Sequence, residues 1–246
     1  MVRSVARARV APAEVALTPV GAAPPVGPRT AGPRRRVLRT TGLAALAAGA
    51  ALVAPQAARA AAPRTLLVVG DSLSAEYGLS RGSGWVALLQ KRIDERRLPW
   101  RVVNASISGE TTAGGRSRFA DLLSRHAPDL VVVELGGNDA LRGLPLGGTE
   151  SNLREMVAAA RRSGSRTVLF GMQMPPNYGR AYGEQFSALF RRVADTEKVP
   201  LLPFFLQPIA ERADAFQPDR IHPTEAAQPL LLEHAWAVLA PLLGAK

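Results

Sequence analysis

A serine follows the first apolar run of the chain, in the segment Gly70-Asp71-Ser72-Leu73-Ser74. At a turn between a strand and a helix, a serine is exposed at the end of the sheet, and the N-terminus of the helix stabilises developing negative charge. The hydroxyl is a poor nucleophile until a base removes its proton during attack. Taken alone, Ser72 could equally be a helix N-cap. It is therefore a candidate nucleophile that requires a partner base.

The candidate base is His222, one of three histidines, in a loop that leads into the last predicted helix. Asp219 precedes it by three residues, close enough for its carboxylate to turn back onto the imidazole, fix its tautomer and stabilise the imidazolium. Alternatively, Asp219 only organises its own turn. His126 lies at a helix end and is expected to be a cap or a surface group, and His234 is expected on the surface of the last helix or partly buried in it.

Two further groups could stabilise negative charge on a substrate oxygen. Asn138 follows the third apolar run in Gly136-Gly137-Asn138-Asp139, and its side-chain amide can donate a hydrogen bond. Gly109 follows the second run, where glycine lets its backbone N–H approach a substrate closely. Each could be an ordinary turn residue. A serine, a glycine, an asparagine and a histidine together nevertheless supply the roles that acyl transfer requires.

Alternating apolar runs and helical patterns predict the elements that position these residues. The expected strands are 65–70, 101–105, 130–135, 167–171 and 201–205. The expected helices are 85–96, 116–126, 150–163, 184–197 and 224–243. Such alternation predicts an α/β fold, a five-stranded parallel sheet covered on both faces by right-handed crossovers, and the flavodoxin-like order 2-1-3-4-5 is the expected one. Ligands bind beyond the carboxyl ends of such strands, where all the candidate groups fall.

The N-terminal segment has a different composition and predicts an export signal. Residues 1–36 are rich in Ala, Pro and Arg without an apolar pattern, and are expected to be unfolded. A basic cluster at 34–39, an apolar run at 40–54 and the small-x-small site Ala58-Arg59-Ala60 follow, as in a signal peptide. The arginine pair leaves the twin-arginine and general secretory routes open, and a disordered basic tail is the alternative. We therefore expect an export signal at 1–60, a catalytic domain at 61–246 and a periplasmic or secreted protein.

Composition excludes several classes of function. Nine of the 31 basic residues and one of the 20 acidic residues precede residue 61, which leaves 22 and 19 and a net charge of +3 for the remainder. The high overall charge therefore belongs to the leader and gives no reason to expect nucleic-acid binding. The chain has no cysteine, which excludes disulfides, a thiolate nucleophile and a cysteine-based metal site. The run 40–54 is short for a membrane span, and no stable span is expected after processing.

These motifs together resemble those of the SGNH, or GDSL-type, hydrolases. Residues 70–74 are similar to the first block of the family, Gly109 lies in the second, Asn138 in the third, and Asp219 and His222 in the D-x-x-H block. The resemblance covers roughly 65–242 and is closest to the bacterial thioesterase I, lysophospholipase and arylesterase branch. The segments that carry this closer match are Val133–Asp139, Pro175–Gly179 and Val199–Phe205.

The resemblance implies a three-layer α/β/α fold and a serine esterase without metal or cofactor. It implies Ser72, Asp219 and His222 as the catalytic triad, and Ser72, Gly109 and Asn138 as the oxyanion hole. It also implies a mobile loop at about 140–149 that recognises acyl chains. The candidate substrate-binding residues there are Ala140, Leu141, Arg142, Gly143 and Leu144. Ala140 stands where close relatives carry glycine, and the loop is apolar.

The expected substrate is a small acyl ester or thioester, and the expected protein is a monomer. A carbohydrate or cell-wall O-deacetylase on the same scaffold is the main alternative, and the apolar loop favours acyl chains instead. A non-catalytic lipid-binding protein is the second alternative.

Overall fold

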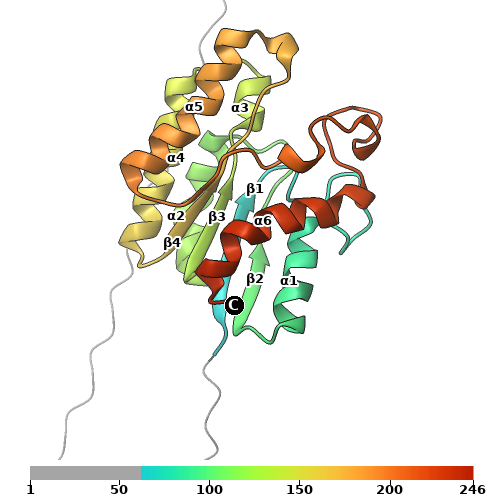
Figure 1. Ribbon diagram of the computed structural model, residues 1–246. Helices are drawn as coiled ribbons and strands as arrows, with labels where there is room; N and C mark the ends of the chain where they lie inside the picture. The colour runs from blue at the N-terminus through green and yellow to red at the C-terminus, as the bar shows by residue number, and fades with distance from the viewer. Residues whose placement is uncertain (1–61, 246) are drawn as a thin grey trace, which may run out of the picture. The chain divides into compact units, whose positions relative to one another are not determined.

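The structure, a computed structural model, describes residues 62–245. Its centre is a parallel sheet of five strands in the order β2-β1-β3-β4-β5, which confirms the predicted order (Figure 1). The strands are β1 Arg64–Gly70, β2 Trp100–Asn104, β3 Leu130–Glu134, β4 Arg166–Phe170 and β5 Leu201–Leu202. All pair in parallel, so their carboxyl ends lie at one edge of the sheet, at the top of Figure 1.

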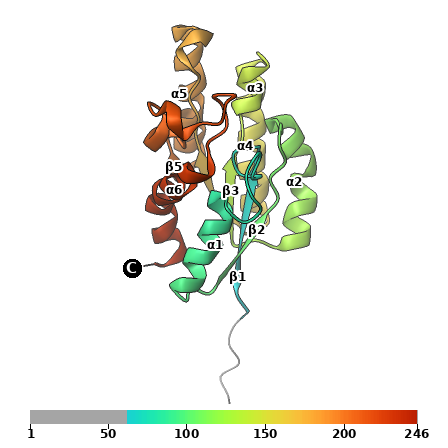
Figure 2. The same ribbon diagram turned by 90° about the vertical axis from the view of Figure 1, so that its right-hand side faces the viewer.

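Helices cover both faces of the sheet. The long helices are α1 Trp85–Glu95, α2 Thr112–His126, α4 Leu146–Arg162, α5 Arg180–Glu197 and α6 Gln228–Leu243. The helices α1 and α6 pack together on one face, and α2, α4 and α5 pack on the other (Figure 2). Each presents an apolar stripe inward, for example Trp85, Leu89 and Ile93 of α1, which are fully buried. The three-layer α/β/α architecture is thereby confirmed.

The central strands form the middle of the core. The segment Leu66–Val69 of β1 and the segment Leu130–Val133 of β3 are buried on both faces, as expected of parallel strands between two helical layers. Beneath α1, the rings of Trp85, Phe170 and Phe205 form a cluster with centroids 5.3 to 5.6 Å apart. This core holds β1 rigidly, and the candidate nucleophile follows β1 directly.

Several helices begin earlier than the apolar periodicity predicts. Helix α2 begins at 112 rather than 116, because the Thr111 hydroxyl caps it by accepting a hydrogen bond from Gly114 N–H at 3.2 Å. Helix α5 begins at 180 rather than 184. A short helix, α3 Gly137–Leu141, was not predicted, and α4 begins at 146 rather than 150. The loop expected at 140–149 is therefore largely helical, and only 142–145 connect the two helices.

The last strand is shorter than predicted. It covers 201–202 rather than 201–205, and its last ladder bond to β4 runs from Gly171 N–H to the Leu202 carbonyl at 2.7 Å. The chain then turns over the end of β4, where Phe205 N–H donates to the Gly171 carbonyl at 2.9 Å. This turn buries Phe205 under the sheet edge.

The segment Glu225–Leu243, which contains α6, is long and apolar enough to cross a membrane by length and hydropathy alone. In the fold, its Leu231, Ala235 and Leu239 are fully buried against the core. These contacts are those of a core helix. The predicted export signal at 1–60 lies outside the described residues.

Candidate active site

The candidate residues converge at the carboxyl edge of the sheet. Ser72 follows β1, Gly109 follows β2, and Asn138 lies in α3 directly after β3. The second loop is tied to the first, because Ile107 N–H donates to the Gly70 carbonyl at 3.1 Å. Asp219 and His222 come from the long segment before α6, which crosses the same edge (Figure 1).

Ser72, His222 and Asp219 form a continuous hydrogen-bonded chain. His222 Nε2 lies 2.8 Å from Ser72 Oγ, and His222 Nδ1 lies 2.7 Å from Asp219 Oδ2. The carboxylate therefore holds the tautomer with the proton on Nδ1, which leaves Nε2 free to accept the serine proton. This geometry is that of an activated serine nucleophile.

The turn at 217–222 explains how a carboxylate only three residues away reaches the imidazole. Asp219 Oδ1 accepts hydrogen bonds from the backbone N–H groups of Ile221 at 2.9 Å and His222 at 3.0 Å. Gln217 N–H donates to the His222 carbonyl at 2.7 Å, which closes the turn. The His222 backbone N–H, followed by its ring, lowers the pKa of Asp219 from 3.8 to about 2. Asp219 is therefore ionised across the whole physiological range.

Tyr77 packs against the imidazole from outside. Its ring centroid lies 4.3 Å from that of His222, and its backbone carbonyl accepts a hydrogen bond from Gln217 Nε2 at 2.9 Å. Tyr77 was not predicted from the sequence, because its spacing from Ser72 does not indicate contact with a residue 145 positions later. The stacking limits the orientations open to the imidazole.

Three hydrogen-bond donors belong to the segments that follow β1, β2 and β3 at the catalytic edge: Ser72 N–H, Gly109 N–H and Asn138 Nδ2. Within residues 62–245, the backbone N–H groups of Ser72 and Gly109 donate to no other group. Gly109 has a φ of 77°, a conformation that favours glycine. Asn138 Nδ2 donates to Asp71 Oδ2 at 3.0 Å, which leaves its second amide hydrogen available. These three donors can surround an oxyanion.

Two buried carboxyl groups, Asp71 and Glu134, lie beneath the nucleophile turn, and neither was predicted to have a role. Asp71 Oδ1 also accepts from Leu73 N–H at 3.0 Å, and burial raises the pKa of Asp71 from 3.8 to about 6. Glu134 Oε2 accepts from Ser74 Oγ at 2.8 Å. Burial, and then the charge of Asp71, raise the pKa of Glu134 well above its usual value. A glutamate at the end of an otherwise apolar strand is the signal that could have identified it.

The candidate substrate-binding residues divide into two groups. Ala140 is only 1% exposed and packs in the core, so its side chain is not available at the surface. Its carbonyl accepts a hydrogen bond from Tyr182 Oη at 3.3 Å. Leu141, Arg142, Gly143 and Leu144 are exposed. Arg142 Nη2 donates to the Gly109 carbonyl at 2.8 Å and links this loop to the loop after β2, a contact that the sequence did not indicate.

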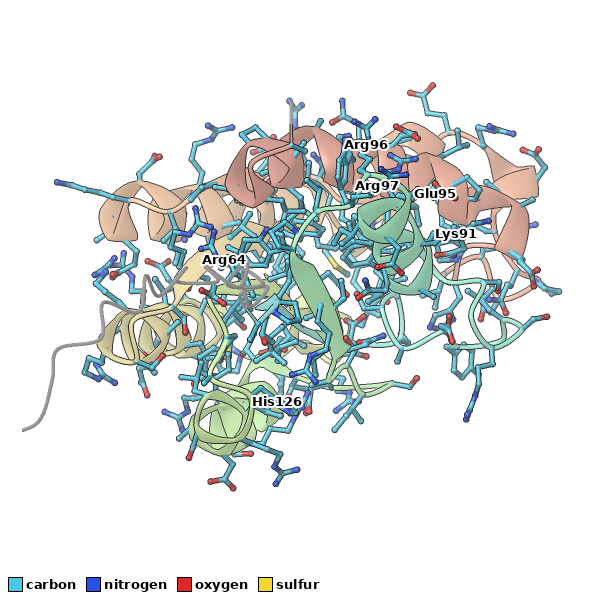
Figure 3. The ribbon with its side chains drawn as sticks, turned by 90° about the horizontal axis from the view of Figure 1, so that it is seen from below. Arg64, Lys91, Glu95, Arg96, Arg97 and His126 are labelled. Carbon is cyan, nitrogen blue, oxygen red and sulfur yellow. The ribbon has the colours of Figure 1, made fainter. Side chains whose placement is uncertain are left out.

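The other two histidines are not part of the site. His234 Nε2 lies 3.0 Å from the Phe204 carbonyl and joins α6 to the turn after β5. His126 lies at the amino end of the sheet, away from the catalytic edge (Figure 3). Among residues 62–245, no group of three or more histidines or acidic residues is arranged to hold a metal ion.

A cavity of about 410 Å³ opens between the end of β4 and the start of α5. The segment Gln173–Pro175 lines one side, and Gly179, Arg180 and Gly183 line the other. Pro175 and Gly179 bound a segment that already carried part of the family resemblance. The cavity itself could not be read from the sequence, because it depends on how α5 leaves the sheet.

Comparison with known proteins shows the family of the chain. Residues 68–229 match the GDSL-like Lipase/Acylhydrolase family. The chain is 52% identical to Esterase TesA of Pseudomonas aeruginosa over 74% of this chain and 91% of that protein. It is 43% identical to Thioesterase 1/protease 1/lysophospholipase L1 of Escherichia coli over 76% of this chain and 88% of that protein.

A solved structure agrees as well. A crystal structure of TesA superposes with a TM-score of 0.71 at 52% identity, and the match covers 73% of this chain and 99% of that one. The fold, the site geometry and these relatives agree: the chain belongs to the GDSL-like, or SGNH, hydrolases, in the branch that contains TesA and thioesterase I.

Proposed function

We propose that this hydrolase cleaves carboxylic esters and thioesters through an acyl-enzyme on Ser72. The observation that carries the proposal is the unbroken chain from Ser72 Oγ through His222 to Asp219, with links of 2.8 and 2.7 Å. As Ser72 Oγ bonds to the substrate carbonyl carbon, its proton passes to His222 Nε2, and Asp219 stabilises the imidazolium. The alcohol or thiol then leaves with that proton.

The second half of the reaction uses the same groups. His222 Nε2 accepts a proton from water as the water attacks the acyl carbon, and the acid leaves as Ser72 recovers its proton. The negative charge on the carbonyl oxygen in both steps is met by Ser72 N–H, Gly109 N–H and Asn138 Nδ2. Fixed donors of this kind lower the barrier because they are already oriented when the charge develops.

The relatives and the apolar loop support acyl esters and thioesters as the substrate class. One relative is named for thioesterase and lysophospholipase activities and another for esterase activity. Leu141 and Leu144 are exposed next to the proposed oxyanion hole and suit an acyl chain better than a sugar. The exposed part of the 140–149 segment is therefore proposed to contact the acyl chain, without the side chain of Ala140.

The test is a substrate panel with the purified protein and its Ser72→Ala variant. The panel contains p-nitrophenyl butyrate and hexanoate, an acyl-CoA, a lysophospholipid and an acetylated sugar. We expect turnover of the acyl esters and the thioester, with kcat lowered by about 10⁴-fold or more in Ser72→Ala. Wild-type rates in the variant would reject Ser72, and turnover of the acetylated sugar alone would favour the deacetylase alternative.

The proposed base also predicts how activity depends on pH. An imidazole that has already bound a proton cannot accept the serine proton, so a histidine base predicts that kcat/KM falls as the pH is lowered from 8 to 5. Asp219 does not contribute to this loss, because its pKa of about 2 keeps it ionised there. A flat profile over this range would exclude a histidine base.

We also propose that residues 1–60 direct the protein out of the cytoplasm. The order of basic cluster, apolar run and Ala58-Arg59-Ala60 site supports this. Cell fractionation and N-terminal sequencing test this proposal. Replacing Arg35 and Arg36 with lysine distinguishes the twin-arginine route from the general secretory route, because only twin-arginine export should stop. A full-length protein retained in the cytoplasm would contradict the proposal.

A further inference from the structure

The exposed apolar side chains of this protein are not scattered. Within residues 62–245, seven large hydrophobic side chains are more than a third exposed. Six of them lie on the segments that follow the strands at the catalytic edge, and we call these six the apolar rim: Tyr77, Ile107, Leu141, Leu144, Tyr178 and Ile221. The seventh, Leu230, lies on α6. Isolated exposed hydrophobic residues are ordinary, but a group of them on one face marks an interaction site.

Hydrogen bonds and packing join the segments that carry the rim. Tyr77 stacks on His222, which is the neighbour of Ile221 in the chain. Arg142 joins the segment of Leu141 and Leu144 to the loop of Ile107 through its bond to the Gly109 carbonyl. Tyr182, in the first turn of α5 and four residues after Tyr178, donates to the Ala140 carbonyl. These contacts connect the segments that carry the rim with those that carry His222 and Gly109.

Charge on the same edge favours an anionic partner. Arg81, Arg142 and Arg220 are exposed there, and none forms an ion pair within the described residues. The nearby acids are engaged locally: Glu76 accepts from the backbone N–H groups of Gly82 and Gly84, and Asp219 holds His222. The edge therefore presents apolar groups and unneutralised guanidinium groups together.

The opposite end of the sheet differs from the catalytic edge in its exposed hydrophobic side chains. Viewed from the amino ends of the strands, it presents Arg64, Lys91, Glu95, Arg96 and Arg97 (Figure 3). Arg64 is paired with Asp129 and lies over the Trp100 ring. None of the seven exposed hydrophobic side chains belongs to the segments labelled there.

We propose that the apolar rim docks on the surface of phospholipid aggregates, so that Ser72 receives its substrate directly from the lipid. This proposal rests on the proposed ester hydrolysis at Ser72 and adds the physical state of the substrate. Aliphatic side chains enter the acyl region, tyrosines lie at the level of the headgroups, and arginines pair with lipid phosphates. A protein partner would not require this combination around the entrance to an ester-cleaving site.

Vesicle binding tests the docking directly. The wild-type protein is sedimented with vesicles of phosphatidylglycerol and phosphatidylcholine, beside the double variant Ile107→Ser/Tyr178→Ser and the control Leu230→Ser. We expect the double variant to lose about tenfold or more in vesicle affinity, because two half-exposed apolar side chains no longer enter the lipid, and Leu230→Ser to match wild type. Equal binding by the double variant and the control would overturn the proposal.

Kinetics separate docking from chemistry. Hydrolysis of a lysophospholipid is measured below and above the concentration at which it forms micelles, and p-nitrophenyl butyrate serves as the soluble reference. The rate of lysophospholipid hydrolysis by the wild type should increase when micelles form. The double variant should show no such increase, and its rate on the soluble ester should stay within about twofold of the wild-type rate. No acceleration in the wild type would overturn docking but leave the proposed function intact, whereas loss of the soluble-ester reaction from the wild type would reject the function itself.

The variant Arg81→Gln tests whether the arginines at the catalytic edge contribute to binding of anionic lipid. The variant Arg125→Gln, on α2, is its control. Each arginine near an anionic surface contributes roughly a fivefold gain in affinity, so Arg81→Gln should weaken binding to phosphatidylglycerol vesicles by about that factor. Arg125→Gln should have no effect. If the rim variants instead change the oligomeric state in gel filtration and leave vesicle binding unaltered, the rim is a contact between copies of the chain and the lipid proposal is wrong.

Discussion

Two serines in the nucleophile turn have opposite environments. Ser72 Oγ faces His222 at the catalytic edge, whereas the side chain of Ser74 is buried, donates to Glu134 and accepts from Trp85 Nε1 at 3.2 Å. Gly70 makes room for this arrangement, because a Cβ there would lie 2.8 Å from both Glu134 Oε2 and Ser74 Oγ. The motif therefore combines one reactive serine with one that anchors the turn.

Asp71, between these groups, orients the proposed oxyanion-hole asparagine. Replacing Asp71 with alanine removes the acceptor for Asn138 Nδ2, so the amide can rotate away from the substrate oxygen. We expect kcat to fall by about 10- to 100-fold with KM changed by less than about threefold, since the loss falls on the transition state.

Asp71→Asn is the matched variant. Its single amide oxygen can still accept from Asn138, so its kcat should lie between those of the wild type and Asp71→Ala. Steady-state kinetics on p-nitrophenyl butyrate measure both, and an Asp71→Ala enzyme with wild-type kcat would exclude the orienting role.

Helix α3 carries Asn138, and Gly136 is the residue at which the chain turns into this helix. Gly136 has a φ of 120°, and a Cβ there would lie 3.1 Å from Phe190 Cζ. Gly136→Ala should therefore displace α3, reduce kcat by about tenfold or more and lower the free energy of unfolding by about 1–3 kcal/mol.

Gly147, in the first turn of α4, provides the control. A Cβ there meets no atom within 4 Å, and its φ is not positive. Gly147→Ala should keep kcat and stabilise the protein by up to about 1 kcal/mol. Urea unfolding and kcat measure the pair, and equal behaviour of the two variants would contradict the account of α3.

Most of the strands and helices, and the strand order, were predictable from the sequence. The alternation of apolar runs and helices implied the parallel sheet and its order, because right-handed crossovers leave few alternatives. It did not predict α3, whose five residues are too few to show a helical period. Nor did it predict the early end of β5, because the apolar run continues to Phe205 although the regular pairing with β4 ends at Leu202. Asp219 and His222 were predicted because their spacing is local, whereas Tyr77, Glu134 and the contact of Arg142 depend on segments distant in sequence.

For the molecule as a whole, the buried carboxyl groups make stability depend on pH. Burial raises the pKa of Asp71 from 3.8 to about 6 and that of Glu134 well above 4.5, so the folded protein binds more protons than the unfolded chain. The stability contributed by these two groups is therefore fully present below their unfolded values and is lost as pH rises through their folded values. The pKa of Asp219 is lowered instead of raised, so its contribution to stability is lost only as the pH falls from 3.8 towards about 2.

Glu134→Gln tests this linkage. The amide has the shape of a protonated carboxyl group and no charge to bury, so the Tm of the variant relative to wild type should rise as pH increases above about 4.5. Glu155→Gln is the control, because Glu155 is exposed and pairs with Arg116, which lowers its pKa. Thermal unfolding from pH 4 to pH 8 measures the Tm of both variants. A difference in Tm between Glu134→Gln and wild type that does not change with pH would contradict the raised pKa of Glu134.

Covalent labelling with a fluorophosphonate, located by peptide mass spectrometry, tests whether Ser72 is the activated nucleophile. We predict a single adduct on Ser72, no adduct in Ser72→Ala, much slower labelling in His222→Ala, and labelling of Ser72 retained in Ser74→Ala. An adduct on another residue, or labelling of Ser72→Ala at the wild-type rate, would show that the chain from Ser72 to Asp219 does not activate the nucleophile of this enzyme.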